Sequence, residues 1–238
     1  MNDIGIIIPI YKLKLTENEE RAFVNNLDKI TTYPIIFLAP YSLDTSWYES
    51  KGDFKIQRFE DKYFRSDVTY TKLLLNPKFY KAFSEYIYIL ILQTDVWILQ
   101  EDSVLSKFLA YQYDYIGAPW KQGINAYAYT FKGIAHFPKF ISRSRTVYVG
   151  NGGLSLRKVE SQIALLKKYW LRRRLWRKVG EDIFFAYYGQ RDVAYSIAPI
   201  EIAEIFSLET SAKEDIQSGV LPFGIHAWEK YYPEIAGE

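Results

Sequence analysis

Three short, almost continuously apolar runs constrain the fold of this 238-residue chain more than any other feature. They are Ile4–Ile10 (IGIIIPI), Tyr33–Pro40 (YPIIFLAP) and Tyr86–Leu92 (YIYILIL). Runs of this length that are rich in β-branched residues are typical of strands buried on both faces. The three runs therefore predict the central strands of a sheet.

Helical patterns alternate with these runs in the first half of the chain. The capping-box sequence TENE (Thr16–Glu19) opens an amphipathic stretch that ends at about residue 30. Lys55–Glu60 indicates a third, more polar strand, and Thr69–Phe83 has helical spacing that Pro77 interrupts. Strands that alternate with helices predict an α/β fold with a mainly parallel sheet.

The second half of the chain is less regular. Tyr113–Trp120 resembles a strand that ends in a turn, and Val147–Arg157 a strand broken by the glycine-rich segment Gly150–Gly153. Between them, Lys121–Thr146 shows no clear periodicity, which suits a long functional loop or a lid. A helix is predicted over Lys158–Lys178. We find no internal repeat or Pro/Ser-rich linker, so we predict a single domain over residues 1–238.

Composition excludes several classes of function. The formal net charge is +2, which gives no global electrostatic case for nucleic-acid binding. The chain has no cysteine, so disulfides, zinc–thiolate sites and thiol nucleophiles are excluded. No apolar stretch reaches the roughly 18 residues of a membrane span, and the apolar run at the N-terminus is too short for a signal peptide. We expect a soluble, cytoplasmic protein.

Asp95 is the most informative charged residue, because it directly follows the strong strand Tyr86–Leu92. Ligands in open α/β sheets bind beyond the carboxyl ends of the strands. A bound cation would balance the charge of Asp95 there. The alternative is that Asp95 only forms a turn after the strand.

Three more segments carry candidate chemistry. Gly150–Gly153 (GNGG) lets the backbone approach a ligand closely, or forms a hairpin turn. Glu181 and Asp182 begin a predicted helix, where they either cap it or include a general base. His226, in an apolar setting, is either a core histidine or a metal ligand. His136 shows no such context, and we expect it to be structural or exposed.

Together these stretches resemble glycosyltransferases of the GT-A type, and more closely a largely uncharacterised bacterial family of glycosyltransferase-like domains. The resemblance runs from about Tyr63 to Trp228. Its motifs are YILILQTDVWIL, YDYIGAPW, VGNGGLSLRK, EDIFF, AEIFSLE and FGIHAW, and IIIPIYK resembles the first strand and nucleotide-binding loop of such enzymes. The resemblance implies a single GT-A-like, Rossmann-like α/β/α sandwich. Residues 1–100 would form its nucleotide-binding half, and residues 101–238 its acceptor-binding half.

The resemblance also implies a donor site with a divalent cation, Mn²⁺ or Mg²⁺. The metal motif of the family, usually Asp-x-Asp, is Gln93-Thr94-Asp95 here, so Asp95 would coordinate without a second acid beside it. His226 matches the second metal ligand. Pro9 and Tyr11 would line the nucleobase pocket.

The remaining implied residues serve the sugar and the chemistry. Asp182 matches the base of inverting members, and Glu181 would orient a sugar hydroxyl or the loop. Asn151, Gly152 and Gly153 would reach the donor sugar or the acceptor. Trp120 would form an aromatic wall for a sugar, with simple packing as the alternative.

The implied activity is hexosyltransferase-like transfer from a nucleotide sugar to a glycan or lipid-linked acceptor, in surface polysaccharide synthesis. The alternatives are an inactive nucleotide-sugar-binding protein, a nucleotidyltransferase and a sugar-nucleotide hydrolase. The basic, aromatic stretch Lys167–Lys178 is a candidate for contact with the anionic inner face of the membrane, or else a solvated helix face.

Overall fold

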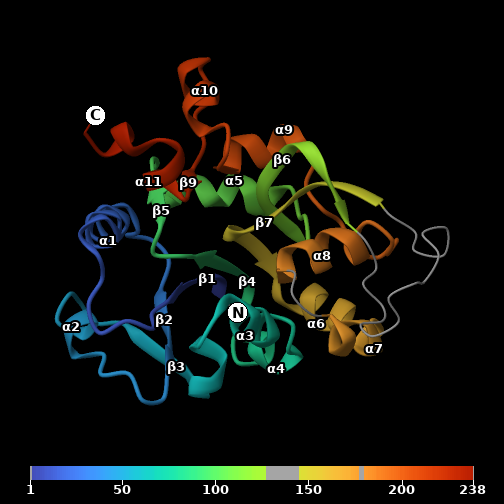
Figure 1. The fold of residues 1–238 in the computed structure, drawn as a ribbon, viewed down its shortest axis with the longest axis horizontal. Coiled ribbons are helices and arrows are strands. Elements are labelled where there is room, and N and C mark those ends of the chain that lie inside the picture. Colours follow the sequence, from blue (N-terminus) through green and yellow to red (C-terminus); the bar gives the residue numbers. More distant parts are fainter. Residues whose placement is uncertain (1, 127–144, 177–179, 238) are drawn as a thin grey trace.

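A computed structural model describes residues 2–126, 145–176 and 180–237. Its centre is a six-stranded sheet with the order β3-β2-β1-β4-β7-β6 (Figure 1). The strands are β1 (Asn2–Pro9), β2 (Ile35–Pro40), β3 (Lys55–Phe59), β4 (Tyr86–Leu92), β6 (Tyr115–Ala126) and β7 (Arg145–Lys158). β1, β2, β3 and β4 pair in parallel, and β7 runs antiparallel to both of its neighbours. The predicted α/β fold with a mainly parallel sheet is confirmed.

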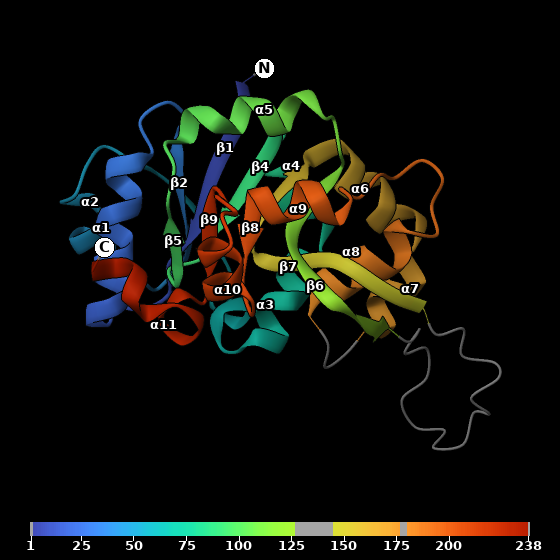
Figure 2. The same cartoon turned by 90° about the horizontal axis from the view of Figure 1, so that it is seen from above.

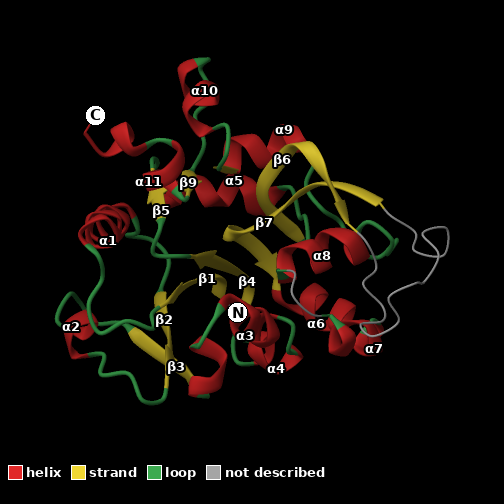
Figure 3. Cartoon of the chain, in the orientation of Figure 1, coloured by secondary structure: helices red, strands yellow, loops and turns green. Residues whose placement is uncertain are grey.

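Helices cover both faces of this sheet (Figure 3). The α-helices of the described residues are α1 (Glu17–Lys29), α2 (Ser46–Glu49), α3 (Asp67–Leu74), α4 (Pro77–Lys81), α5 (Leu105–Ala110), α6 (Val159–Lys168), α7 (Trp170–Leu175), α8 (Glu181–Gly189), α9 (Ile200–Phe206), α10 (Ala212–Gln217) and α11 (Trp228–Tyr231). Ile7 of β1 packs in one core cluster with α4, α6 and α8, whereas Ile6 and Ile8 pack in another with α1 and α5. Successive residues of a strand face opposite sides, so an all-apolar strand supplies both layers.

Two local predictions of helix boundaries are confirmed. Thr16 caps α1, and Glu19 completes the capping box. Pro77 separates α3 from α4, and Asn76 caps the second helix with Pro77 at its first position. Pro fits that position because its missing N–H has no helical partner there.

A second, three-stranded sheet lies beside α1 and α11 (Figure 2). Its strands are β5 (Val96–Ile98), β9 (Gly224–His226) and β8 (Ser207–Leu208), in the order β5-β9-β8. Val96 pairs with His226 across the antiparallel β5–β9 ladder, and Leu208 pairs with Ile225 across the parallel β8–β9 ladder. This small sheet joins three distant parts of the chain at one end of the large sheet.

The structure corrects the prediction for the glycine-rich segment. β7 runs without a break through Gly150–Gly153, and these glycines do not have a positive φ, so the hairpin turn is wrong. The pairing with β6 shifts register at this segment, because Gly117 pairs with Ser155 but the next residue, Ala118, pairs with Asn151. Neighbouring side chains approach these glycines so closely that a Cβ has no room.

Two other elements differ from their predicted ranges. β6 continues past the predicted turn to Ala126, so the predicted loop or lid begins inside a strand. The rest of it, residues 127–144 with His136, lies outside the described residues. The helix predicted over Lys158–Lys178 divides at Tyr169 into α6 and α7, and residues 177–179 also lie outside the described part.

The predicted division into halves at about residue 100 stays a prediction. The large sheet contains strands from both halves. Within the described ranges, none of the helices is both long and apolar enough to cross a bilayer.

Candidate functional site

A pocket of about 300 Å³ opens where β1 and β4 end. Pro9 is the last residue of β1, and the turn after β4 supplies the opposite wall. The predicted donor-binding residues all line the pocket: Pro9, Tyr11, Gln93, Thr94 and Asp95. The first turn of α3 and the residues just before it complete the wall with Phe64, Arg65, Ser66, Asp67 and Tyr70. The position agrees with the rule that open α/β sheets bind ligands at the carboxyl ends of their strands.

Glu19 connects three segments around this pocket. Its carboxylate accepts hydrogen bonds from Lys12 Nζ at 2.7 and 2.9 Å, and from the hydroxyl of Thr94 at 3.1 Å. Burial alone would raise the pKa of Glu19, but Lys12 and Thr16 hold it below its ordinary value, so the residue is charged. The sequence predicted Glu19 as part of a helix cap. It gave no signal for the link to Thr94, which only the fold creates.

Asp95 and His226 come together at the edge of the pocket. The β5–β9 ladder places Val96 opposite His226, and Asp95 immediately precedes this pair. Nε2 of His226 lies 3.5 Å from Oδ2 of Asp95. The Asp95 side chain is 44% exposed and that of His226 is 14% exposed, so the aspartate is the one that a ligand reaches first.

Glu209, which follows β8, lies on the other side of the same histidine. Its Oε1 is 3.3 Å from Nδ1 of His226, and its Oε2 accepts a hydrogen bond of 2.8 Å from the amide of Asn151. Burial lowers the pKa of His226, but the carboxylates of Glu209 and Asp95 outweigh it and raise the pKa. The sequence indicated AEIFSLE only as a stretch of the resemblance, and it did not single out Glu209.

The donor set around Asp95 fits a divalent cation. It combines a carboxylate oxygen with an imidazole nitrogen. Mn²⁺ accepts both ligands, whereas Mg²⁺ prefers the carboxylate oxygen. Across the described residues, no group of three or more His, Cys, Asp or Glu side chains is arranged to hold a metal. A cation here therefore needs further oxygens from phosphate or water.

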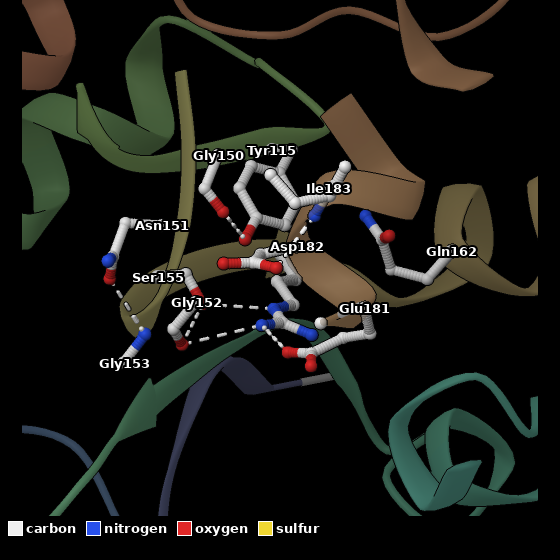
Figure 4. A network of polar contacts seen from close by, with 12 residues as sticks. Tyr115, Gly150, Asn151, Gly152, Gly153, Ser155, Gln162, Glu181, Asp182 and Ile183 are labelled. Carbon is white, nitrogen blue, oxygen red and sulfur yellow. Dashed lines mark hydrogen bonds and ion pairs between the residues drawn. The ribbon is translucent and has the colours of Figure 1, made fainter. Parts of the chain in front are cut away.

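The glycine-rich segment packs against the start of α8 (Figure 4). Arg157 of β7 is fully buried, and its guanidinium donates to Oε1 of Glu181 at 2.9 Å and to the hydroxyl of Tyr80 at 3.0 Å. A Cβ on Gly152 would lie 2.9 Å from Glu181 and 3.0 Å from Arg157. Glu181 is thus engaged in a buried ion pair, and its predicted contact with a sugar stays a prediction.

Asp182 has a different environment from Glu181. Its Oδ1 accepts from the backbone N–H of Ile183 at 2.7 Å, and its carboxylate has no ion-pair partner in the described part of the chain. Burial, together with the nearby charge of Glu181, raises the pKa of Asp182 to about 7. A carboxyl group with this pKa exchanges protons near neutral pH, as a general base must.

Two of the predicted sugar-binding residues make contacts within the protein. Trp120 packs over Gly150, where a Cβ would lie 2.8 Å from its ring. Asn151 donates to Glu209, and its Oδ1 accepts from the N–H of Gly153 at 3.1 Å. These contacts favour packing for Trp120 and a supporting role for Asn151, and direct contact of either with a sugar stays a prediction.

Comparison with solved structures identifies the fold. The apo form of mouse xyloside xylosyltransferase 1 matches with a TM-score of 0.58 at 13% identity, over 94% of this chain and 97% of that one. The apo form of the glycosyltransferase GlyE from Streptococcus pneumoniae TIGR4 matches with a TM-score of 0.52 at 11% identity. That match covers 95% of this chain and 54% of GlyE. The chain therefore has a glycosyltransferase-like fold.

The sequence comparisons give the family. A search of curated protein sequences found no match. The family model described as "Protein of unknown function (DUF5672)" matches residues 53–226, which is well over half of the chain and includes Asp95, Asp182 and His226. The protein belongs to the DUF5672 family.

Proposed function

We propose that this protein is a hexosyltransferase-like glycosyltransferase. It would move a sugar from a nucleotide sugar to a hydroxyl group of a glycan or lipid-linked acceptor. The observation that carries the proposal is that Asp95, which lines the pocket at the ends of β1 and β4, lies 3.5 Å from Nε2 of His226. The fold shared with two glycosyltransferases supports it. Surface polysaccharide synthesis in the cytoplasm is the setting that we propose.

The donor nucleotide would lie in the pocket, with its base beside Tyr11 and Pro9. Tyr11 is 51% exposed, which leaves its ring open for stacking on a flat base. Thr94 is held by Glu19, so the turn after β4 keeps its shape before the donor arrives. A preformed pocket lowers the cost of ordering a ligand.

Asp95 and His226 would hold the cation, Mn²⁺ or Mg²⁺, which when bound supplies a Lewis acid for the diphosphate. Gln93 contributes no charge where the resemblance leads one to expect an acid. Its backbone N–H instead donates to the carbonyl of Gly153 at 3.0 Å and ties the turn to β7. Asp95 would therefore be the one carboxylate of the QTD segment on the cation.

Asp182 would accept the proton of the acceptor. In a direct displacement, the acceptor oxygen bonds to the anomeric carbon as the bond from that carbon to the phosphate oxygen breaks. The electron pair leaves with the nucleoside diphosphate, and the proton moves to the Asp182 carboxylate. A pKa of about 7 makes this carboxylate both available and basic enough at neutral pH.

A panel of nucleotide sugars tests the function. The full chain is incubated with Mn²⁺, each donor and a mixture of glycan and lipid-linked acceptors, and released nucleoside diphosphate is measured. We expect release with one donor that depends on acceptor, and a loss of about 10²–10⁴-fold in Asp182→Asn with donor affinity retained.

Each alternative function predicts a different result. Acceptor-independent release would indicate a hydrolase, and pyrophosphate release a nucleotidyltransferase. Donor binding without turnover would indicate a binding protein. Full turnover in Asp182→Asn would remove the residue from its proposed role.

We further propose that α7 contacts an anionic membrane surface. Trp170 and Leu171 are 53% and 50% exposed, and they lie among exposed basic residues: Lys167, Lys168, Arg172 and Arg174. Exposed apolar side chains surrounded by cations suit the interface of an anionic bilayer. Trp176 is buried and takes no part.

Vesicle sedimentation tests this contact. Binding to vesicles with phosphatidylglycerol should exceed binding to pure phosphatidylcholine, and the double variant Trp170→Ala/Leu171→Ala should reduce it. Leu221→Ala, another exposed apolar position, serves as the control and should have no effect. Equal binding to both kinds of vesicle would contradict the proposal.

A further inference from the structure

The register of the small sheet places a carboxylate behind His226. Leu208 of β8 pairs with Ile225 of β9, so the residues that come next in the chain, Glu209 and His226, lie side by side. Both side chains are largely buried, with 15% of Glu209 and 14% of His226 exposed. Such burial is expensive for a charged glutamate unless its oxygens have partners.

Asn151 and His226 are the partners of this carboxylate. Asn151 donates to Oε2 of Glu209 at 2.8 Å, and Oε1 lies 3.3 Å from Nδ1 of His226. Nδ1 is itself buried and has no well-aligned hydrogen bond in the described part of the chain. Glu209 is the acceptor within its reach, and such contacts are often long before a ligand binds.

Glu209 and Asp95 face different nitrogens of the imidazole ring. Asp95 lies near Nε2, at the pocket, whereas Glu209 lies near Nδ1, away from it. Gly153 fixes the ring between them, because a Cβ at this position would overlap the imidazole. The ring therefore occupies a slot with one nitrogen toward the pocket and the other toward Glu209.

We propose that Glu209 is a positioning residue for His226, and that Asn151 holds Glu209 in place. By accepting the Nδ1–H hydrogen bond, Glu209 keeps the lone pair of Nε2 directed at the cation position beside Asp95. A histidine that binds metal through one nitrogen commonly donates the other N–H to a carboxylate, which fixes both tautomer and orientation. This inference rests on the proposed function, since it concerns the same cation.

Binding of Mn²⁺ to the full chain, without any donor, tests the role of Glu209. Gln in place of Glu209 keeps the shape but offers one acceptor oxygen to two donors, Asn151 and His226. We expect Glu209→Gln to weaken Mn²⁺ binding about 10–100-fold, as substitutions behind a metal ligand do. Glu204→Gln is the matched control, because Glu204 pairs with Lys121 at 3.1 Å, and it should bind as wild type does.

A second variant and a spectroscopic signal distinguish a weakened cation site from a misfolded protein. Asn151→Ala should weaken binding in the same direction but less, and its effect should not add to that of Glu209→Gln. Electron spin-echo spectra should show nitrogen coupling to Mn²⁺ in wild type and, at saturating metal, in Glu209→Gln. His226→Asn should lack this coupling.

The outcomes separate this inference from the proposed function. Wild-type affinity in Glu209→Gln, with binding lost in His226→Asn and Asp95→Asn, would overturn the positioning role and leave the cation site intact. Binding lost as completely in Glu209→Gln as in His226→Asn would show that Glu209 is a ligand, which also overturns the role. No Mn²⁺ binding by wild type, with or without a nucleoside diphosphate, would overturn the cation site and the inference together. Glycosyl transfer is scored separately, by nucleoside diphosphate release.

Discussion

The proposed donor pocket and the centre around Arg157 both depend on an ion pair, but the cations of the two pairs differ in burial. Lys12, which binds Glu19 beside the pocket, is 36% exposed, whereas Arg157 is fully buried. The two carboxylates are alike, with 12% of Glu19 and 10% of Glu181 exposed. Water screens the charges of the first pair, so its side chains can move when a ligand binds. The second pair is shielded, so each charge depends on the other. The pocket is therefore suited to accept a ligand, and the centre to hold β7 against α8.

Breaking the buried pair should have the largest effect on stability. Arg157→Met leaves Glu181 without its cation, and we expect a loss of about 3–5 kcal/mol in the free energy of unfolding. Lys12→Met, which breaks the pair with Glu19 beside the pocket, should cost about 1 kcal/mol or less. Urea unfolding measures both. Equal losses would contradict the contrast between the two regions.

The pH dependence of transfer should report Asp182, which adjoins the buried centre. Because its pKa is about 7, transfer should rise as pH increases through 7 and fall about tenfold per pH unit below it. The contribution of Asp182 to the free energy of unfolding has the opposite trend with pH. A pKa raised by folding favours the protonated form, so this contribution is full below about pH 4 and is lost as pH rises to about 7.

Activity and urea unfolding of wild type and Asp182→Asn, followed from pH 4 to pH 9, check both trends. The stability gain of the variant over wild type should be larger at pH 8 than at pH 4. A flat rate profile across pH 7 would contradict the assignment of the base.

Gly153 is the point where β7 meets His226, beside the proposed cation position. Ala at this position would push the His226 ring aside, so we expect about 1–3 kcal/mol of destabilisation and a clear loss of Mn²⁺ affinity. Gly237→Ala is a suitable control, because nothing lies within 4 Å of its Cβ. Thermal unfolding and metal titration measure the two effects. Unchanged Mn²⁺ affinity in Gly153→Ala would argue against the slot for His226.

The smallest effect should come from the turn after β4. Thr94→Val keeps the shape but removes the hydrogen bond to Glu19, which is worth about 0.5–1.5 kcal/mol. We expect nucleoside diphosphate affinity to fall about 3–10-fold, and the free energy of unfolding to fall by no more than the worth of this bond. Calorimetric titration gives the affinity. If stability fell and affinity did not, the bond would serve the fold rather than the pocket.

Much of the fold could be predicted because its signals are local. An all-apolar strand such as Tyr86–Leu92 and the capping box at Thr16 each reveal their structure within a few residues. The Asn-Gly signal at Asn151 misled for the same reason, because close approach of His226 and Arg157, rather than a turn, requires those glycines. Local patterns report backbone preference and not what packs against it.

The residue pattern predicted the parts of the site, but only the resemblance connected Asp95 with His226, as two ligands of one cation. The pattern could not connect them, because their proximity arises from β5 and β9, which are too short to show a periodic pattern. Glu209 and Arg157 escaped notice because their partners lie far along the chain. The contact of Glu209 with His226 is set by strand register, which the sequence pattern does not specify for two- and three-residue strands.

The most direct test of the account is the affinity for nucleoside diphosphate with and without Mn²⁺, measured by calorimetry for wild type, Asp95→Asn and His226→Asn. We predict that Mn²⁺ tightens binding at least tenfold in wild type and has little effect in either variant, because both residues hold the cation that meets the diphosphate. An equal gain from Mn²⁺ in all three proteins would contradict the central claim that Asp95 and His226 form the donor-binding cation site.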